Sequence, residues 1–257
     1  MKGEAIIIYQ KTGFVANITI NRPDNGNAVD MELSQELADI CTAINQDETV
    51  RVVVITAAGE RHFSSGTDPA LLAIMAQKQQ MKLPSGTKAI LGINQPVIAA
   101  INGDALGQGL ELALACDLRV AAETAHLGLP QIISGLIPWD GGTQLLPRVV
   151  GRTKAAEMIL TGKIISALEA CEIGLVNRVV PSKELMPTVI EMAQAMSLRA
   201  PIALRHAKEA IRKGLELTLE QGLRLEADLY LLLQTTEDRI EGIKAFLERR
   251  QPKFKGK

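Results

Sequence analysis

Three short stretches of this sequence carry groups that could take part in proton-transfer chemistry. HFSSGTD at 62–68 is a turn of small residues that follows an apolar segment. NGDALGQGLELALACD at 102–117 joins a glycine-rich turn to an apolar helical pattern that contains one carboxylate, Glu111. GLPQIISGLIPWDGG at 128–142 contains an amide and a second carboxylate before a pair of glycines. No single stretch predicts a function, but together they could place N–H donors and carboxylates around one substrate.

The turns at 62–68 and 102–108 could supply backbone N–H donors. A glycine-bearing turn at the start of a helix leaves N–H groups unpaired where the helix dipole is positive. If the two turns face one another, two donors would converge on one oxygen, which suits a thioester carbonyl that becomes an enolate. An ordinary strand-to-helix turn is the alternative for 62–68, because Gly and Ser favour turns. A dinucleotide fingerprint is excluded, since its third glycine would fall at Leu112.

Glu111 is a lone carboxylate in the first turn of the apolar run LELALA. Its neighbours, Leu110 and residues 112–115, cover most of the helical circumference and leave little solvated face. It is either an exposed residue of an amphipathic helix or a buried functional acid. A buried acid one helical turn from an N–H donor could move a proton at the α or β carbon of a thioester.

The polar groups of the third stretch are Gln131 and Asp140. An amide cannot donate or accept a catalytic proton at neutral pH, so Gln131 can only orient a water or a substrate oxygen. Asp140 stands beside Trp139 and before two glycines, where partial desolvation would raise the pKa of a carboxylate towards the range useful for acid/base work. The alternative is that Asp140 caps the next helix through DGGT.

Composition narrows the class of protein. The chain has 257 residues, 47% of them hydrophobic, which is enough for one large domain or a domain with an appendage. Its 28 basic and 29 acidic residues give a net charge of −1, which disfavours nucleic acid as a partner. The cysteines are three in number and lie far apart, so neither a disulfide framework nor a metal site is expected. No signal peptide or membrane span is apparent, and we expect a cytoplasmic protein.

The periodicity predicts an α/β core followed by a helical tail. Strands and helices at short intervals after residue 50 indicate parallel βαβ units. Asp30 is positioned to cap the helix that follows it, and SALE at 166–169 has the pattern of a capping box. We expect a core at 1–190 and a helical region at 191–257. The predicted strands are 5–9, 14–20, 50–56, 95–102 and 117–122, and 151–162 is predicted as a helix.

The sequence closely resembles the crotonase superfamily, the enoyl-CoA hydratases and isomerases. The resemblance implies a β-β-α spiral core, a helical C-terminal trimerisation region, an acyl-CoA substrate and a homotrimer or dimer of trimers. No cofactor is implied beyond the coenzyme A thioester itself. The matching segments follow family order over nearly the whole chain: NRPDNGNA, VRVVVITAAGERHFSSGTD, PVIAAINGDALGQGLELALACDLRVAA, GLIPWDGGTQLLPRVVGR, ISALEACEIGLVNRVVP and EGIKAFLERRQPKFKG.

The resemblance also assigns roles to individual residues. It implies an oxyanion hole formed by the backbone N–H groups of Thr67 and Gln108, where typical members have Ala and Gly. It places Glu111 at the first catalytic glutamate of the hydratases. Contacts to coenzyme A are implied for Asp24, Asn25 and Gly26, and, from a neighbouring subunit, for Phe246 and Arg249.

One departure from the family bears on the reaction. Hydratases usually carry a second glutamate in a segment like GQPEI, whereas this chain has GLPQI with Gln131. Other members place a functional aspartate in the turn that holds Asp140, which makes Asp140 a candidate second carboxylate and Trp139 a candidate wall of the acyl pocket. We expect an enzyme of the hydratase/isomerase type that works through a thioester enolate. The alternatives are an isomerase or carbon–carbon-bond hydrolase of an unusual, cyclic acyl-CoA, and a non-catalytic acyl-CoA-binding or RNA-associated protein.

Overall fold

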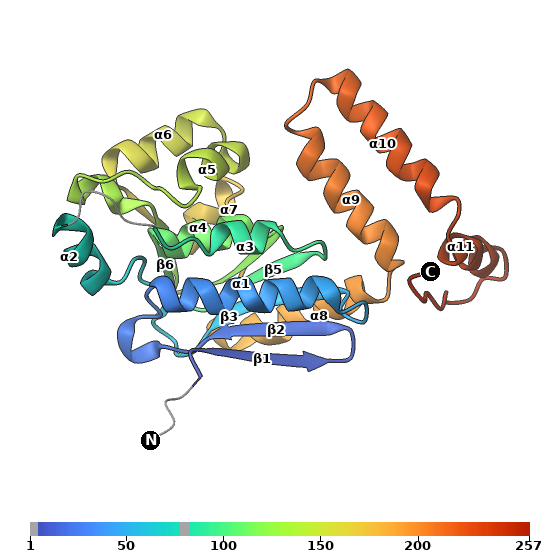
Figure 1. Ribbon diagram of the computed structural model, residues 1–257, viewed down its shortest axis with the longest axis horizontal. Helices are drawn as coiled ribbons and strands as arrows, with labels where there is room; N and C mark the ends of the chain where they lie inside the picture. The colour runs from blue at the N-terminus through green and yellow to red at the C-terminus, as the bar shows by residue number, and fades with distance from the viewer. Residues whose placement is uncertain (1–4, 78–82) are drawn as a thin grey trace.

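The computed structural model describes residues 5–77 and 83–257 (Figure 1). Within them the strands form two sheets. The larger sheet has the order β1-β2-β3-β5-β7-β10, and the smaller has the order β4-β6-β8-β9. The strands of the larger sheet are β1 Ile7–Thr12, β2 Val15–Ile20, β3 Val52–Ala57, β5 Val97–Ile101, β7 Leu118–Ala122 and β10 Arg178–Val180. Those of the smaller are β4 His62–Ser64, β6 Asp104–Leu106, β8 His126–Gly128 and β9 Ile164–Ser166.

A repeating unit links the two sheets. The chain runs from β3 to β4, from β5 to β6 and from β7 to β8, so each unit gives one parallel strand to each sheet before a helical segment. The predicted β-β-α spiral is therefore confirmed, although the sequence pattern missed the short strands of the smaller sheet. The helical segments are α1 Met31–Gln46, α2 Pro69–Gln77, α3 Thr87–Leu91, α4 Gln108–Ala115, η2 Pro130–Ser134, α5 Gly142–Val150, α6 Arg152–Thr161 and α7 Ala167–Glu172.

Side chains of the larger sheet alternate between two apolar cores. Along β3, Val53 and Ile55 belong to the core shared with α1 and α4, while Val52 and Val54 face the other side. That other side is covered by α8 (Leu185–Ser197), which contributes Leu185, Val189 and Ala193 at helical spacing. The expected boundary at residue 190 falls inside α8, and α8 packs on the sheet as part of the core.

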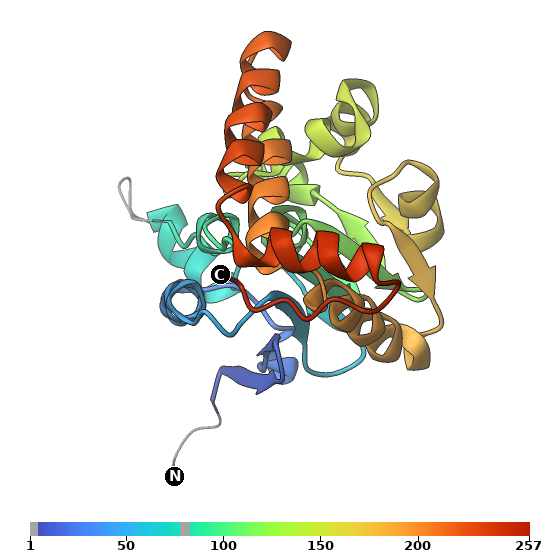
Figure 2. The ribbon, with the colours of Figure 1, turned by 90° about the vertical axis from the view of Figure 1, so that its right-hand side faces the viewer.

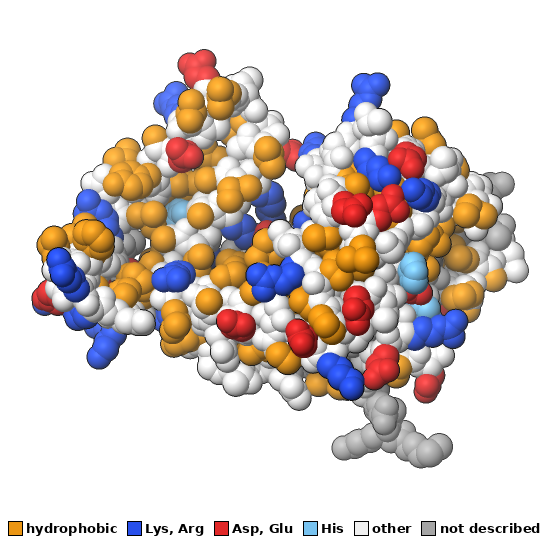
Figure 3. All heavy atoms as spheres, turned by 180° about the vertical axis from the view of Figure 1, so that it is seen from behind, with side chains coloured by type: hydrophobic (Ala, Val, Ile, Leu, Met, Phe, Trp, Pro, Cys, Tyr) orange, Lys and Arg blue, Asp and Glu red, His pale blue; other side chains and the backbone are white. Residues whose placement is uncertain are grey.

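The C-terminal helices are α9 Pro201–Gly214, α10 Leu219–Leu233 and α11 Glu237–Leu247. The hairpin of α9 and α10 extends away from the sheets, and α11 lies at the opposite end of the molecule from α2 and α6 (Figures 1 and 2). Many large apolar side chains on this region are exposed, among them Leu219 at 80%, Phe246 at 83% and Leu247 at 75%. Figure 3 shows apolar atoms spread over this part of the surface. Every helix in the described ranges is too short or too polar to cross a bilayer.

Two predicted helix caps are tested by hydrogen bonds. The Asp30 carboxylate accepts from Leu33 N at 2.8 Å, which confirms it as the cap of α1. Ser166 Oγ accepts from Glu169 N at 3.2 Å. The Glu169 carboxylate was expected to accept from Ser166 N in return, but it forms ion pairs with Lys154 and Lys163 instead. The capping box at 166–169 is thus only half formed, because two lysines compete for its carboxylate.

Candidate active site

Three turns meet at one edge of the smaller sheet. β4, β6 and β8 are neighbouring parallel strands, so their carboxyl ends lie side by side. Thr67 follows β4, Gln108 follows β6 and Gln131 follows β8. A Cβ atom on Gly66 would lie 3.0 Å from the Leu106 carbonyl oxygen and 3.8 Å from Gln108 N. The two turns that could supply N–H donors are therefore in direct contact.

The backbone N–H groups of Thr67 and Gln108 are free to bind a ligand. Neither donates a hydrogen bond to any of the described residues, although the flanking Gly66 N donates to Ser64 Oγ and Asp68 N donates to the Val29 carbonyl. Gln108 N belongs to the first turn of α4, where N–H groups lack partners within the helix and the dipole favours negative charge. Two such donors on touching turns form a suitable oxyanion site.

Glu111 is fully buried in α4, all of whose side chains are buried. Its Oε1 accepts from Asp140 N at 2.9 Å and from Gly142 N at 2.8 Å, and its Oε2 accepts from Gln131 Nε2 at 3.2 Å. The pKa of Glu111 is raised to about 7, mainly by burial and also by the nearby Asp140 charge, although the two backbone N–H bonds act to lower it. A carboxyl group poised near neutrality can both take and return a proton.

Gln131, which contacts Glu111, and Trp139, which precedes Asp140, each carry an unsatisfied polar atom. Gln131 Nε2 donates to Glu111, whereas Gln131 Oε1 is buried and has no hydrogen-bond partner among the described residues. A carboxylate accepts hydrogen bonds, so this contact fixes which end of the amide faces Glu111. Trp139 Nε1 is likewise buried without a partner in the described chain. Gln131 Oε1 is therefore an acceptor beside Glu111 that remains available to a ligand.

Asp140 is 6% exposed and accepts four hydrogen bonds. Ser85 Oγ donates to Oδ1 at 2.6 Å, and three N–H donors bind Oδ2: Gly86 N at 3.2 Å, Thr87 N at 3.2 Å and Gln108 Nε2 at 3.4 Å. The alternative that Asp140 caps the helix after it is wrong, because Gly141 is the N-cap residue of α5 and no side chain caps that helix. The carboxylate binds the start of α3 instead.

The predicted coenzyme A loop lies next to these turns. Asp24 and Asn25 form a single helical turn, η1 (Pro23–Asn25), and Gly26 follows with φ of +59°. Ser65 N donates to the Gly26 carbonyl at 2.9 Å, and a Cβ on Gly26 would lie 2.8 Å from Ser65 Oγ. A groove of about 280 Å³ runs along this loop. Asp24 and Gly26 thus form one wall of a groove whose other wall is residues 58–62.

Phe246 and Arg249 lie elsewhere. Phe246 is on α11, and Arg249 lies two residues beyond the end of that helix with φ of +55°. Both are exposed, and α11 lies at the far end of the molecule from α2 and α6 (Figure 1). Within one chain the structure does not bring these two residues to Glu111.

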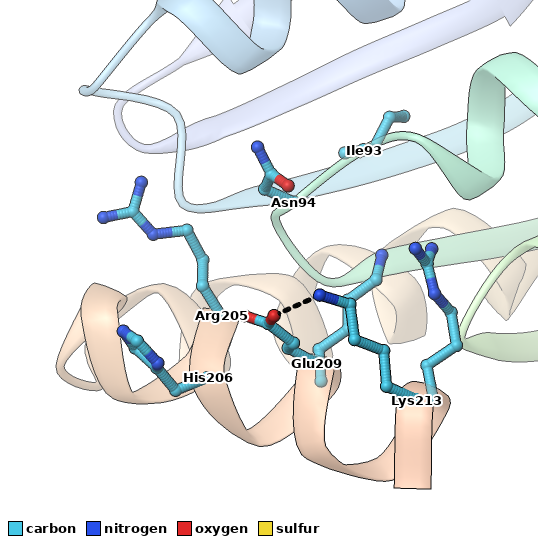
Figure 4. A pocket seen from close by; sticks show the side chains of 8 residues that line it. Ile93, Asn94, Arg205, His206, Glu209 and Lys213 are labelled. Atoms are coloured by element: carbon cyan, nitrogen blue, oxygen red, sulfur yellow. Dashed lines mark hydrogen bonds and ion pairs between the residues drawn. The ribbon is translucent and has the colours of Figure 1, made fainter. Parts of the chain in front are cut away.

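A basic hollow between α9 and the Ile93–Asn94 segment is a separate feature (Figure 4). Two of its cations form ion pairs inside the chain, and a third donates to a backbone carbonyl. Lys208 Nζ lies 2.7 Å from Asp117 Oδ2, Lys213 Nζ lies 2.6 Å from Glu209 Oε1, and Arg212 donates to the Leu91 carbonyl. Two of the four Lys and Arg side chains that line the hollow are thus neutralised by carboxylates of the same chain.

Comparisons with known proteins identify the family of this chain. Residues 10–257 match the enoyl-CoA hydratase/isomerase family. The 2,3-dehydroadipyl-CoA hydratase of Escherichia coli is 41% identical over 98% of this chain and 99% of its own length. The crotonyl-CoA hydratase of Syntrophomonas wolfei is 38% identical, with 96% and 97% covered. The chain belongs to the enoyl-CoA hydratase/isomerase family.

A solved member of the family has the same fold. The enoyl-CoA hydratase from Bacillus anthracis superposes with a TM-score of 0.92 at 43% identity, covering 98% of this chain and 100% of that one. The predicted crotonase-like fold and an enzyme of the hydratase/isomerase type are both confirmed. Reasoning from the sequence did not foresee that Ser85 and the side chain of Gln108 bind Asp140. The only signal in the sequence was the pair of departures from family residues at Thr67 and Gln108.

Proposed function

We propose that this family member adds water across the double bond of α,β-unsaturated acyl-CoA thioesters, with Glu111 as its single acid/base group. The thioester oxygen binds between the N–H groups of Thr67 and Gln108, which stabilise the negative charge that develops there. The coenzyme A moiety leaves the site along the loop at Asp24, Asn25 and Gly26. Trp139 borders the acyl group.

The proton path requires only one carboxylate. A water molecule donates one hydrogen bond to Glu111 Oε2 and the other to Gln131 Oε1. Glu111 takes a proton as the water oxygen bonds to the β carbon, and the electrons of the double bond move to the thioester oxygen as an enolate. Glu111 then returns the same proton to the α carbon. The product is a 3-hydroxyacyl-CoA, and Glu111 ends in its starting state.

The observation that supports this path most directly is that the two oxygens of the Glu111 carboxylate have different hydrogen-bond partners. Oε1 is held by two backbone N–H groups, while Oε2 has a single donor, Gln131, whose own oxygen is unpartnered. Oε2 and Gln131 Oε1 thus form two adjacent acceptors, which is what a bound water with two hydrogens needs. Asp140, with four donors on its carboxylate, is better suited to positioning than to proton transfer.

Double-bond isomerisation is the second candidate. It is favoured by the same single carboxylate, because moving one proton between two carbons of an enolate needs only one base. Carbon–carbon-bond hydrolysis that uses Asp140 as a second carboxylate gains no support, since the Asp140 oxygens are already engaged.

The test is turnover of crotonyl-CoA and of but-3-enoyl-CoA by the purified protein, with products identified by mass spectrometry. We expect 3-hydroxybutanoyl-CoA from crotonyl-CoA, with oxygen from labelled water incorporated. Conversion of but-3-enoyl-CoA to crotonyl-CoA without any hydrated product would reject hydration in favour of isomerisation. No turnover of either thioester, or of longer and branched ones, would reject both.

We also propose that the protein assembles as a trimer or a dimer of trimers. The exposed apolar side chains of α10 and α11, including Leu219, Leu223 and Leu247, would be costly to leave in water. In this arrangement Phe246 and Arg249 contact the coenzyme A bound to a neighbouring subunit. Light scattering at micromolar concentration should give a trimeric or hexameric mass, and a monomeric mass would contradict the proposal.

A further inference from the structure

We infer that the side chain of Gln108, held between Thr67 and Asp140, is a positioning device that fixes the spacing of the two oxyanion-hole N–H groups. The inference rests on the proposed function, since it concerns how that oxyanion hole is built. It gives a positioning role to the side chains of Thr67 and Gln108, the two residues whose backbone N–H groups bind the thioester oxygen. Neither side chain has a role in the proton path above.

The hydrogen bonds form a continuous chain. Thr67 Oγ1 donates to Gln108 Oε1 at 2.8 Å, and Gln108 Nε2 donates to the Pro84 carbonyl at 3.0 Å and to Asp140 Oδ2 at 3.4 Å. Gln108 is fully buried. An amide buried this deeply would be destabilising unless its polar atoms were paired, and here its oxygen and its nitrogen both are.

This series of hydrogen bonds links every group that must be aligned for the reaction. The Thr67–Gln108 bond joins the turn after β4 to the start of α4 across the site, in addition to the backbone contact at Gly66. Asp140 continues the connection, because its carboxylate binds Gln108 while its own N–H holds Glu111 Oε1. One hydrogen-bond network therefore connects the two residues that carry the oxyanion donors with Glu111.

Such bracing acts on the transition state. Donors that are fixed in place cost no reorganisation as charge develops, and small displacements of reacting groups cost large factors in rate. A tie between two side chains that does not itself touch the substrate should lower kcat when it is broken and leave KM nearly unchanged. Loss of a purely structural hydrogen bond would instead lower the melting temperature without this kinetic pattern.

Thr67→Val and Gln108→Met test the tie, since both variants keep the backbone N–H and approximate the original shape. We expect kcat for crotonyl-CoA to fall about tenfold in each. The double variant should lose no more than the worse single variant, because both break the same bond. Thr67→Ser keeps the hydroxyl and should restore the rate. Thr56→Val is the matched control. Thr56 lies on β3, outside the site, and its buried hydroxyl donates to the Ala100 carbonyl of β5 at 2.9 Å.

A spectroscopic readout separates this inference from the proposed reaction. Carbonyl-labelled butanoyl-CoA is saturated and cannot be hydrated, and its carbonyl stretching frequency should drop when it binds to the wild type. Thr67→Val and Gln108→Met should reduce that drop, while Thr56→Val and Glu111→Gln should retain it. If crotonyl-CoA is not turned over but the frequency still depends on Thr67 and Gln108, the proposed reaction fails and the positioning role stands. Unchanged kcat and unchanged frequency in both variants would overturn the positioning role.

Discussion

In the turns that follow β4, β6 and β8, most buried polar groups find hydrogen-bond partners inside the same chain. Glu111 has three donors and Asp140 has four. In α10 and α11 the situation is reversed, because large apolar side chains such as Leu219 and Phe246 are exposed to solvent. One region is thus held by polar contacts within the chain, whereas the other leaves apolar surface uncovered, as the proposed assembly of subunits would explain.

Replacing the buried acid should have the largest effect. Glu111→Gln is expected to lower kcat for crotonyl-CoA by about 100-fold or more, because the amide cannot carry the proton. Its oxygen can still accept from Asp140 N and Gly142 N, so folding and coenzyme A binding should persist. Steady-state kinetics and a thermal melt measure both quantities. Rates near those of the wild type would remove Glu111 from the mechanism.

The second prediction concerns the other region. Phe246→Ala should raise KM for acyl-CoA about tenfold with little change in kcat, because stacking an aromatic ring on a base is worth about 1–3 kcal/mol and acts equally in ground and transition states. The exposed Leu168 on α7 offers the control, since Leu168→Ala should leave KM unchanged. Light scattering should show that both variants keep the mass of the wild type. An unaltered KM in an intact oligomer would separate Phe246 from the coenzyme A site.

The third prediction distinguishes positioning from proton transfer at Asp140. Asp140→Asn keeps one oxygen for the N–H donors, and its new amide can donate to Ser85 Oγ, so kcat should fall only a fewfold. Asp140→Ala leaves four donors without their acceptor and should cost about 2–3 kcal/mol of folding stability. Denaturant titration and kinetics on both variants decide the matter. A loss of 100-fold or more in a stable Asp140→Asn protein would make Asp140 a second acid/base group.

The sequence could predict the parts of this contrast that depend on local pattern. Glycine turns after apolar runs indicated two candidate sources of N–H donors, and the family resemblance named Thr67 and Gln108 within them. The apolar neighbours of Glu111 made its burial one of two open alternatives, and the structure shows it buried. The family motifs supplied the spiral that periodicity missed, because strands of three residues such as β4 and β6 are too short to show an alternation. The binding of Asp140 to Ser85 and Gln108 was beyond reach, since it joins segments up to 55 residues apart whose contact only the folded chain defines.

The smallest predicted effect is on the pH dependence of stability. Burial raises the pKa of Glu111 to about 7 in the folded chain, against about 4.3 in an unfolded one. The folded state therefore holds a proton that the unfolded state has lost between these values, so this group makes the wild type progressively less stable as pH rises from about 4.3 to 7, with no further change above that.

Glu111→Gln removes this titration. The melting temperature of the variant, relative to the wild type, should therefore rise by a few degrees between pH 5 and pH 8. The exposed carboxylate of Glu172 on α7 provides the control, since Glu172→Gln should follow the wild type across the same range. The same titration predicts that kcat falls below about pH 7 as Glu111 becomes protonated and can no longer accept a proton from water. A melting difference that stays constant, together with a flat rate profile through neutrality, would mean that Glu111 is ionised throughout and that the three donors outweigh its burial.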